Sequence, residues 1–133
     1  IMASILKVDT LTGVTTAGSI SVTGEGNSTT TNLQQGLAKA WVNYAQATPL
    51  LKDSFNVSSV SDDATGDYTQ SYTSSFDSTY YSIVATSEDY HQRTRTKATG
   101  TTQCQNWYVS STGGGRTTTD GNDYNTQTHG DLA

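Results

Sequence analysis

Two polar stretches in the C-terminal half hold the side chains of this chain that are best suited to binding a ligand. Ser87 to Thr99 and Ser110 to Tyr124 contain few apolar residues, which predicts loops. Their candidate binding residues are Tyr90, His91, Arg93, Arg95, Arg116, Asp120, Asn122 and Tyr124. Aromatic faces beside fixed hydrogen-bonding groups suit sugars and other cell-surface epitopes. These stretches are therefore the candidates for a recognition surface, although simple solvated connections are the interpretation that we favour for them.

Three cations in the first stretch alternate along the chain. Arg93, Arg95 and Lys97 would share one face if the chain were extended there. Such a face could contact an anionic glycan. The interpretation we favour for these three is a solvated edge strand, where cations discourage aggregation.

Residue patterns for catalysis or metal binding are weak, so we expect neither an enzyme nor a cofactor. His91 and His129 lie far apart, and Glu occurs only at positions 25 and 88. No Gly-x-Ser-x-Gly elbow or phosphate loop is present. The run from Asp120 to Asp123 lacks the alternating ligands of an EF-hand, which favours a polar turn. Cys104 is the single cysteine, and we expect it to be a small buried residue.

Bulk composition indicates a β protein that shares its core between copies. Leu, Ile, Val and Phe make up only about 16% of the 133 residues, while Tyr occurs eight times and Trp twice, among abundant Thr. A strand-forming chain with few aliphatic residues is most simply stabilised by association, so we expect an oligomer. The net charge of -5 argues against nucleic acid as a partner.

The organisation predicted from the sequence is all-β, with a boundary near Asn32. Residues 1–31 are expected to be an extended attachment and oligomerisation segment, with β-like stretches at Ser4 to Leu11 and Ser19 to Thr23 and a linker at Gly24 to Thr31. Its apolar residues, expected to contact other chains, are Ile5, Leu6, Val8, Leu11 and Val14. Residues 32–133 are expected to form a small β-sandwich or jelly-roll-like domain.

Individual elements can also be predicted within the second segment. Asn32 is expected to cap a short helix that ends at Gly36. Strands are expected at Ala38 to Tyr44, Lys52 to Val60, Tyr68 to Phe76, Thr79 to Thr86, Thr101 to Ser111 and Asp123 to Ala133, with a hairpin loop at Ser61 to Asp67. The predicted core or inter-chain seam consists of Phe55, Val57, Tyr72, Ile83, Val84 and Trp107.

Several stretches resemble tail-fibre-like virion proteins of bacteriophages, especially phages of marine bacteria. MASILKVDTLTG from Met2 resembles the opening of that family, and HGDLA from His129 resembles its terminus. The most specific matches are GLAKAWVNY from Gly36 and DSFNVSSVSDDATGDYT from Asp53. The chain departs from the family at Ala45 to Lys52 and in the very polar stretch Ser87 to Thr102.

The resemblance implies a virion component, a homotrimer that displays a β-rich tip to the host. Its partners would be itself, other virion proteins and a host surface receptor such as a glycan. The N-terminus lacks a basic region followed by an apolar run, so we expect no export signal or membrane insertion, and assembly in the host cytoplasm. A tail fibre or tail-tip protein is the leading hypothesis, ahead of a capsid decoration or head-fibre protein and a glycan depolymerase.

Overall fold

The computed structural model describes residues 5–13, 20–24, 30–46, 50–111 and 113–133. The chain divides into two compact units, Ile1–Gly36 and Leu37–Ala133, each of which is described by itself. This division falls a few residues later than the boundary predicted near Asn32, because the short helix belongs to the first unit.

The first unit contains a small hairpin and one helical turn. Strand β1 (Ser21–Thr23) pairs antiparallel with β2 (Thr30–Asn32), and α1 (Leu33–Gly36) follows directly, as predicted. The predicted linker therefore includes the start of β2, while its residues 25–29 lie outside the described part. Residues 5–11 form no strand, which corrects the prediction for that stretch. A β-strand needs a hydrogen-bonded neighbour, and these residues have none in the described part of the unit.

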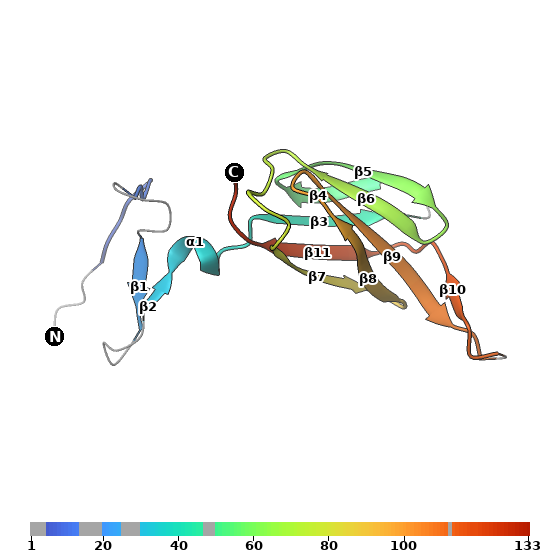
Figure 1. Cartoon of the computed structure of the whole chain (residues 1–133). Coiled ribbons are helices and arrows are strands. Elements are labelled where there is room, and N and C mark those ends of the chain that lie inside the picture. Colours follow the sequence, from blue (N-terminus) through green and yellow to red (C-terminus); the bar gives the residue numbers. More distant parts are fainter. Residues whose placement is uncertain (1–4, 14–19, 25–29, 47–49, 112) are drawn as a thin grey trace. The chain divides into compact units, whose positions relative to one another are not determined.

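The second unit is all-β, and one of its sheets is built around the last strand. This sheet has four antiparallel strands, and β11 lies between β3 and β7 (Figure 1). In spatial order the strands are β4 (Leu50–Phe55), β3 (Ala40–Ala45), β11 (Tyr124–His129) and β7 (Ser82–Ser87).

The other sheet is organised around the longest strand, β9, which pairs with three neighbours. Strand β8 pairs with one edge of β9, while β6 and then β10 pair along its opposite edge. The strands are β10 (Arg116–Thr118), β9 (Thr101–Val109), β6 (Asp67–Tyr72), β5 (Val57–Ala64) and β8 (His91–Lys97). The two sheets face each other across one core, consistent with a β-sandwich.

Tyrosine takes much of the place that aliphatic residues usually fill in such a core. Tyr44, Tyr68 and Tyr124 are fully buried and contact one another, and a second aromatic group joins Tyr72 to Phe76 and Tyr81. The smaller buried members are Ala40, Val42, Val57 and Cys104. This packing gives the unit a private core despite its low aliphatic content.

Buried polar side chains in the same core are joined by hydrogen bonds. The Thr126 hydroxyl donates to Gln70 Oε1 over 2.7 Å, and Gln70 Nε2 donates to the Tyr72 hydroxyl over 2.9 Å. The Tyr72 hydroxyl lies 2.7 Å from Thr102 Oγ1. Because a buried polar group without a partner is costly, this chain of bonds is what allows Thr and Gln inside the sandwich. It also links β11 of one sheet to β6 and β9 of the other.

The predicted strand from Lys52 to Val60 is two strands in different sheets. Asn56 separates β4 from β5 and has φ of 55°, a left-handed conformation that Asn tolerates better than most residues. Its side chain accepts from Ser74 N over 2.7 Å and donates to Ser74 O over 3.1 Å. The chain changes sheet at this residue, so the strand prediction was wrong in its continuity.

The predicted loops are also partly strands. β5 continues to Ala64, so the hairpin turn is limited to Thr65 and Gly66. In the stretch Ser87 to Thr99, His91–Lys97 forms β8, which corrects the loop prediction and matches the edge-strand interpretation of its cations. In the other stretch, Arg116–Thr118 forms β10.

The predicted core residues divide into three groups. Val57 and Tyr72 are buried, and Ile83 is half-buried against the core, so Ile83 rather than Val84 points inward. Phe55 and Val84 are exposed on the outer face of their sheet. Trp107 is half-buried on the outer face of the other sheet, because inward positions along β9 belong to Thr102, Cys104 and Asn106.

Candidate functional site

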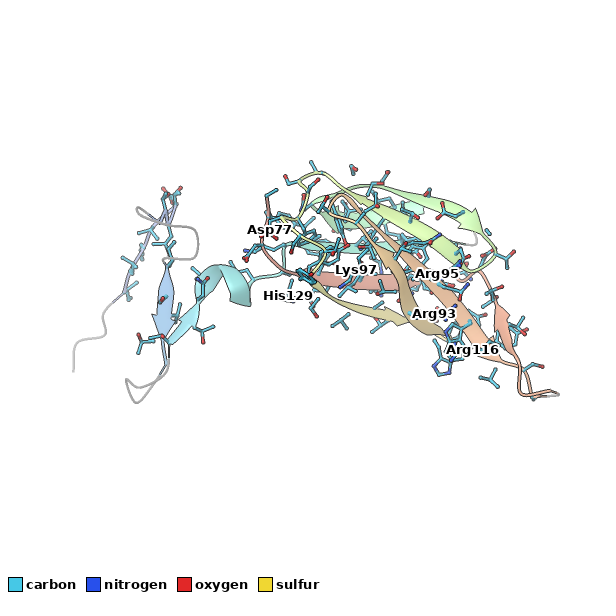
Figure 2. All side chains as sticks on the ribbon, in the orientation of Figure 1. Asp77, Arg93, Arg95, Lys97, Arg116 and His129 are labelled. Atoms are coloured by element: carbon cyan, nitrogen blue, oxygen red, sulfur yellow. The ribbon has the colours of Figure 1, made fainter. Side chains whose placement is uncertain are left out.

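Alternation along β8 and β9 brings several predicted binding residues to one surface. His91 and Arg93 are exposed and lie opposite Trp107 and Gln105 of β9 in the register. Because side chains on alternate positions share a face, all four project from the outer side of the sheet. Figure 2 shows Arg93 with Arg95 and Lys97 along β8 and Arg116 on β10.

Trp107 is the centre of this surface. The His91 ring stacks on it, with centroids 4.5 Å apart and planes 24° from parallel. Arg116 reaches it from β10, where its Cζ lies 4.4 Å from the ring centroid. A guanidinium over an indole face is a favourable cation–π contact, and it keeps the donors at the edge of the guanidinium available to a ligand.

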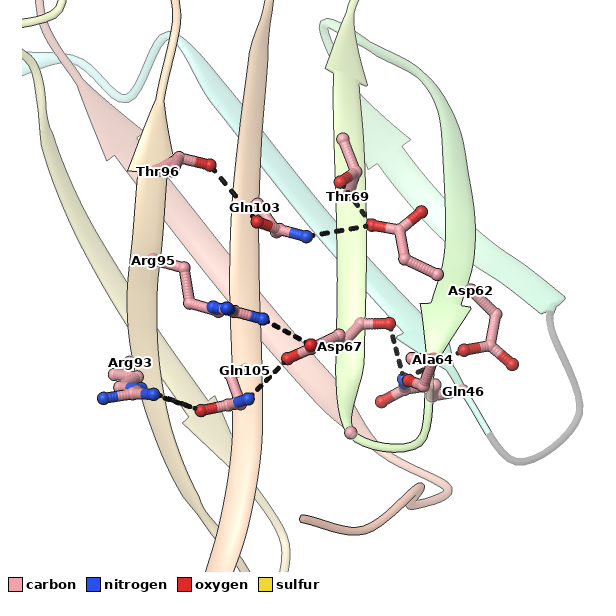
Figure 3. Close-up of polar contacts among 12 residues, drawn as sticks. Gln46, Asp62, Ala64, Asp67, Thr69, Arg93, Arg95, Thr96, Gln103 and Gln105 are labelled. Carbon is pink, nitrogen blue, oxygen red and sulfur yellow. Dashed lines mark hydrogen bonds and ion pairs between the residues drawn. The ribbon is translucent and has the colours of Figure 1, made fainter.

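A ladder of polar side chains supports Arg93 and Arg95 (Figure 3). Arg93 Nε donates to Gln105 Oε1 over 2.9 Å, and Gln105 Nε2 donates to Asp67 Oδ1 over 2.7 Å. Arg95 forms an ion pair with Asp67 Oδ2. The ladder thus fixes the orientation of Arg93 through a neutral amide, while the carboxylate neutralises Arg95.

The guanidiniums of Arg93 and Arg116 have no anionic partner among the described residues. Within the described residues, the ion pairs are Lys52 with Asp123 and Arg95 with Asp67, so neither Arg93 nor Arg116 contacts a carboxylate. We call His91, Arg93, Trp107 and Arg116 the cationic face. On an acidic chain, oriented guanidiniums without counter-charges are chemically suited to binding anions.

Five of the predicted binding residues do not belong to the cationic face, and one of them is Arg95, which is paired with Asp67. Tyr124 is fully buried in the core and has no surface to offer. Tyr90 is half-buried against the core, with its ring centroid 6.2 Å from that of Tyr108. Asp120 accepts from Gly66 N over 2.7 Å, which supports the β5–β6 turn. The carbonyl of Asn122 accepts from Lys52 Nζ over 2.9 Å, away from the face.

Trp107 and Gln105 were not among the predicted binding residues. Along β9, the larger residues Gln103, Gln105 and Trp107 alternate with Thr102, Cys104 and Asn106. This alternation is the signal that could have identified Trp107 and Gln105 as outward-facing, because Thr102, Cys104 and Asn106 are the fully buried set. Trp107 was instead predicted to lie in the core or the inter-chain seam.

The remaining candidates for chemistry are structural. Cys104 is buried, and burial raises the pKa of its thiol to about 11, so it is protonated and unreactive at neutral pH. In the described part of the chain, no three His, Cys, Asp or Glu side chains are grouped so as to hold a metal ion. No helix among those residues is long and apolar enough to cross a membrane.

Comparisons of the chain with protein-family models, curated proteins and solved structures find no match.

Proposed function

We propose that the chain is a non-catalytic structural protein of a phage virion, a tail-fibre or tail-tip component that attaches the particle to the host cell. The observation that carries the proposal is the cationic face, where Arg93 and Arg116 are oriented but have no carboxylate partner. The sequence resemblance to tail-fibre-like proteins supports the same role. The proposed ligand of the face is an anionic group on the host surface, such as an acidic glycan.

The side chains of the cationic face are held in place by contacts with one another and with Gln105. Trp107 is held between His91 and Arg116, and Arg93 is held by Gln105, so little side-chain freedom is lost on binding. A planar guanidinium can bind a carboxylate or sulfate through two parallel hydrogen bonds.

The attachment role can be tested by competition. Purified full-length protein is added to host cells before the phage, and the fraction of particles that adsorb is measured. We expect the protein to reduce adsorption, and the double variant Arg93→Ala/Arg116→Ala to do so at least about tenfold less potently. Lys39→Ala, which removes a charge from the start of the other sheet, is the control.

Each alternative has its own outcome. A protein found in purified particles by mass spectrometry, but unable to compete, would indicate a capsid decoration or head fibre. Absence of the protein from the particles would refute the virion role. Release of reducing sugar from host polysaccharide would indicate a depolymerase.

We further propose a homotrimer assembled through the N-terminal segment. Ile5 and Leu6 are 76% and 80% exposed, and Val8 and Leu11 are also exposed, so this segment does not bury its apolar side chains within one chain. Val14 lies outside the described residues. Sedimentation equilibrium at micromolar concentration should give about three times 14.2 kDa. Replacing Ile5, Leu6, Val8 and Leu11 by Ser should yield a folded monomer, and a monomeric wild-type protein would contradict the proposal.

A further inference from the structure

The outer face of the sheet β4-β3-β11-β7 carries a row of exposed side chains, one from each strand. The register places Phe55 opposite Trp41, Trp41 opposite Gln127, and Gln127 opposite Val84. Trp41 is 37% exposed and Val84 is 59% exposed. This row is separate from the cationic face, which lies on the other sheet.

A hollow of about 330 Å³ lies beside this row. Trp41 of β3 lines it on one side, and Val84 and Thr86 of β7 line it on the other. Asn125 and Gln127 of β11, the strand between them, contribute the polar part of the lining. A volume of this size is at the lower end of the range for small-molecule sites in proteins.

One of the two amides in the hollow is held in a fixed orientation. Asn43 Nδ2 donates to Asn125 Oδ1 over 2.7 Å and to Asp123 Oδ1 over 2.7 Å. Asn125 Nδ2 donates to Asp123 Oδ1 over 3.3 Å, which leaves its second hydrogen free. This arrangement presents an oriented donor without requiring the side chain to reorganise.

The other polar groups in the hollow are available to a ligand. Within the described residues, the side chains of Gln127 and Thr86 make no hydrogen bond. An amide and a hydroxyl each offer both a donor and an acceptor, which matches the hydroxyl groups of a sugar. Trp41 adds an apolar aromatic wall, against which the C–H face of a pyranose ring can stack.

The charges around the hollow favour a neutral ligand over an anionic one. No residue that lines the hollow is charged. The nearby carboxylate of Asp123 lies 3.6 Å from Lys52 Nζ and accepts from Asn43. Asp53 lies opposite Asn43 in the register, so any uncompensated charge at this side is negative and would repel an anion.

A second copy of the chain fits this face less well than a sugar does. The polar strand β11 separates the apolar Trp41 from Val84, so a dry contact would bury the amides of Asn125 and Gln127. Burying such amides without matched partners is unfavourable. Sugar hydroxyl groups supply these partners at short range.

We propose that the hollow lined by Trp41, Val84, Thr86, Asn125 and Gln127 is a binding site for a neutral oligosaccharide. The indole of Trp41 stacks on one pyranose ring, and Asn125, Gln127 and Thr86 bind its hydroxyl groups. The site does not depend on the ligand of the cationic face.

The two tryptophans allow both surfaces to be observed separately. The chain contains only Trp41 and Trp107, one on each sheet, so labelling with 5-fluorotryptophan gives one fluorine NMR signal per surface. The probes are neutral hexasaccharides of glucose, mannose and galactose, each added to the full-length protein up to about 10 mM, since a shallow site of this kind should bind at about the millimolar level. We expect at least one of them to shift the Trp41 signal saturably while the Trp107 signal stays in place.

Gln127→Ala should weaken this binding by about tenfold, because the amide that it removes lines the hollow. Phe55→Ala is the matched control: Phe55 lies in the same exposed row but does not line the hollow, so binding should be unchanged. An unchanged Trp107 signal in each variant shows that the fold is intact.

Three results would overturn the proposal. One is a Trp41 signal that responds to none of the neutral hexasaccharides. Another is a response equal in Gln127→Ala and in the unchanged protein. The third is a Trp41 signal that moves with protein concentration alone, which would assign the face to a second copy of the chain.

Discussion

The rings of Tyr44 and Tyr68 meet between the two sheets, with centroids 4.6 Å apart and planes 53° from parallel. Tyr44 comes from β3 and Tyr68 from β6, so this contact joins the sheets directly. Tyr124 of β11 completes the group, with its centroid 5.3 Å from Tyr44 and 6.0 Å from Tyr68. Three aromatic rings in this position stabilise the sandwich in place of a larger aliphatic core.

Removal of Tyr68 should strongly destabilise the second unit. Tyr68→Ala leaves a cavity where the two sheets meet, and the free energy of unfolding should fall by about 3–5 kcal/mol. Tyr80→Ala is the matched control, because Tyr80 is 95% exposed and its loss should change stability by less than about 0.5 kcal/mol. Urea denaturation of both variants measures the difference, and equal costs would place Tyr68 outside the core.

Trp107→Ala should cost less than Tyr68→Ala. Trp107 is half-buried on the outer face of its sheet, so the substitution removes contacts with His91 and Arg116 but opens no cavity in the core. We expect a loss of about 1–2 kcal/mol in the same denaturation experiment. A loss as large as that of Tyr68→Ala would show that the indole packs into the core.

Gly66 should tolerate no side chain. It has φ of 76°, and a Cβ atom there would lie 2.6 Å from Asn106 O and 2.8 Å from Thr119 N. Gly66→Ala should therefore lower the free energy of unfolding by about 2 kcal/mol or more, from the conformation and the clash together. Gly114→Ala isolates the effect of the backbone conformation, since Gly114 has φ of 65° but open space around it. This substitution should lower the free energy of unfolding by about 1 kcal/mol. Thermal unfolding of the pair would reveal the clash as the difference between them.

Alkaline pH should unfold the protein through its buried tyrosines and Cys104. Burial raises the pKa of Tyr44, Tyr68 and the Cys104 thiol, the last to about 11. These groups lose their protons more readily in the unfolded chain, so their contribution to stability is complete below their unfolded pKa values and is lost as the pH rises above them. From about pH 9 upward, the free energy of unfolding should fall by about 1.4 kcal/mol per pH unit for each group ionised only in the unfolded chain.

The alkaline loss can be assigned by substitution. Tyr68→Phe removes one of the titrating groups and keeps most of the ring packing, so the decline above about pH 10 should be shallower than in the unchanged protein. Chemical denaturation at a series of pH values between 7 and 11 measures this slope. A stability that stays constant over that range would contradict the assignment.

The parts of the fold that follow from local patterns could be predicted from the sequence. The helix before Gly36 and the strands around Val42 and Val84 are visible because their residue types and spacing agree with the structure that forms. The break between β4 and β5 at Asn56 could not be predicted from the local residue pattern. The alternation continues through it, and the break comes from one left-handed residue whose amide binds Ser74 from a distant part of the chain.

The candidate site was predictable only in part, for a related reason. His91, Arg93 and Arg116 could be selected by residue type, because exposed cations beside aromatics are suited to recognition. The contacts of His91 and Arg116 with Trp107, and of Arg93 with Gln105, depend on β8 and β10 pairing with β9, which residue types alone do not specify. Tyr124 was misplaced because an aromatic near a turn can equally well fill the core, as it does here.

The central position of β11 also determines the order in which the chain can fold during translation. Its partners β3 and β7 are synthesised long before it, yet each pairs with it along most of its length. Until β11 leaves the ribosome, both partners have an unpaired edge and Tyr44 lacks one of its aromatic neighbours. The nascent chain is therefore exposed to incorrect pairing with other chains, and its sandwich can close only after β11 has been synthesised.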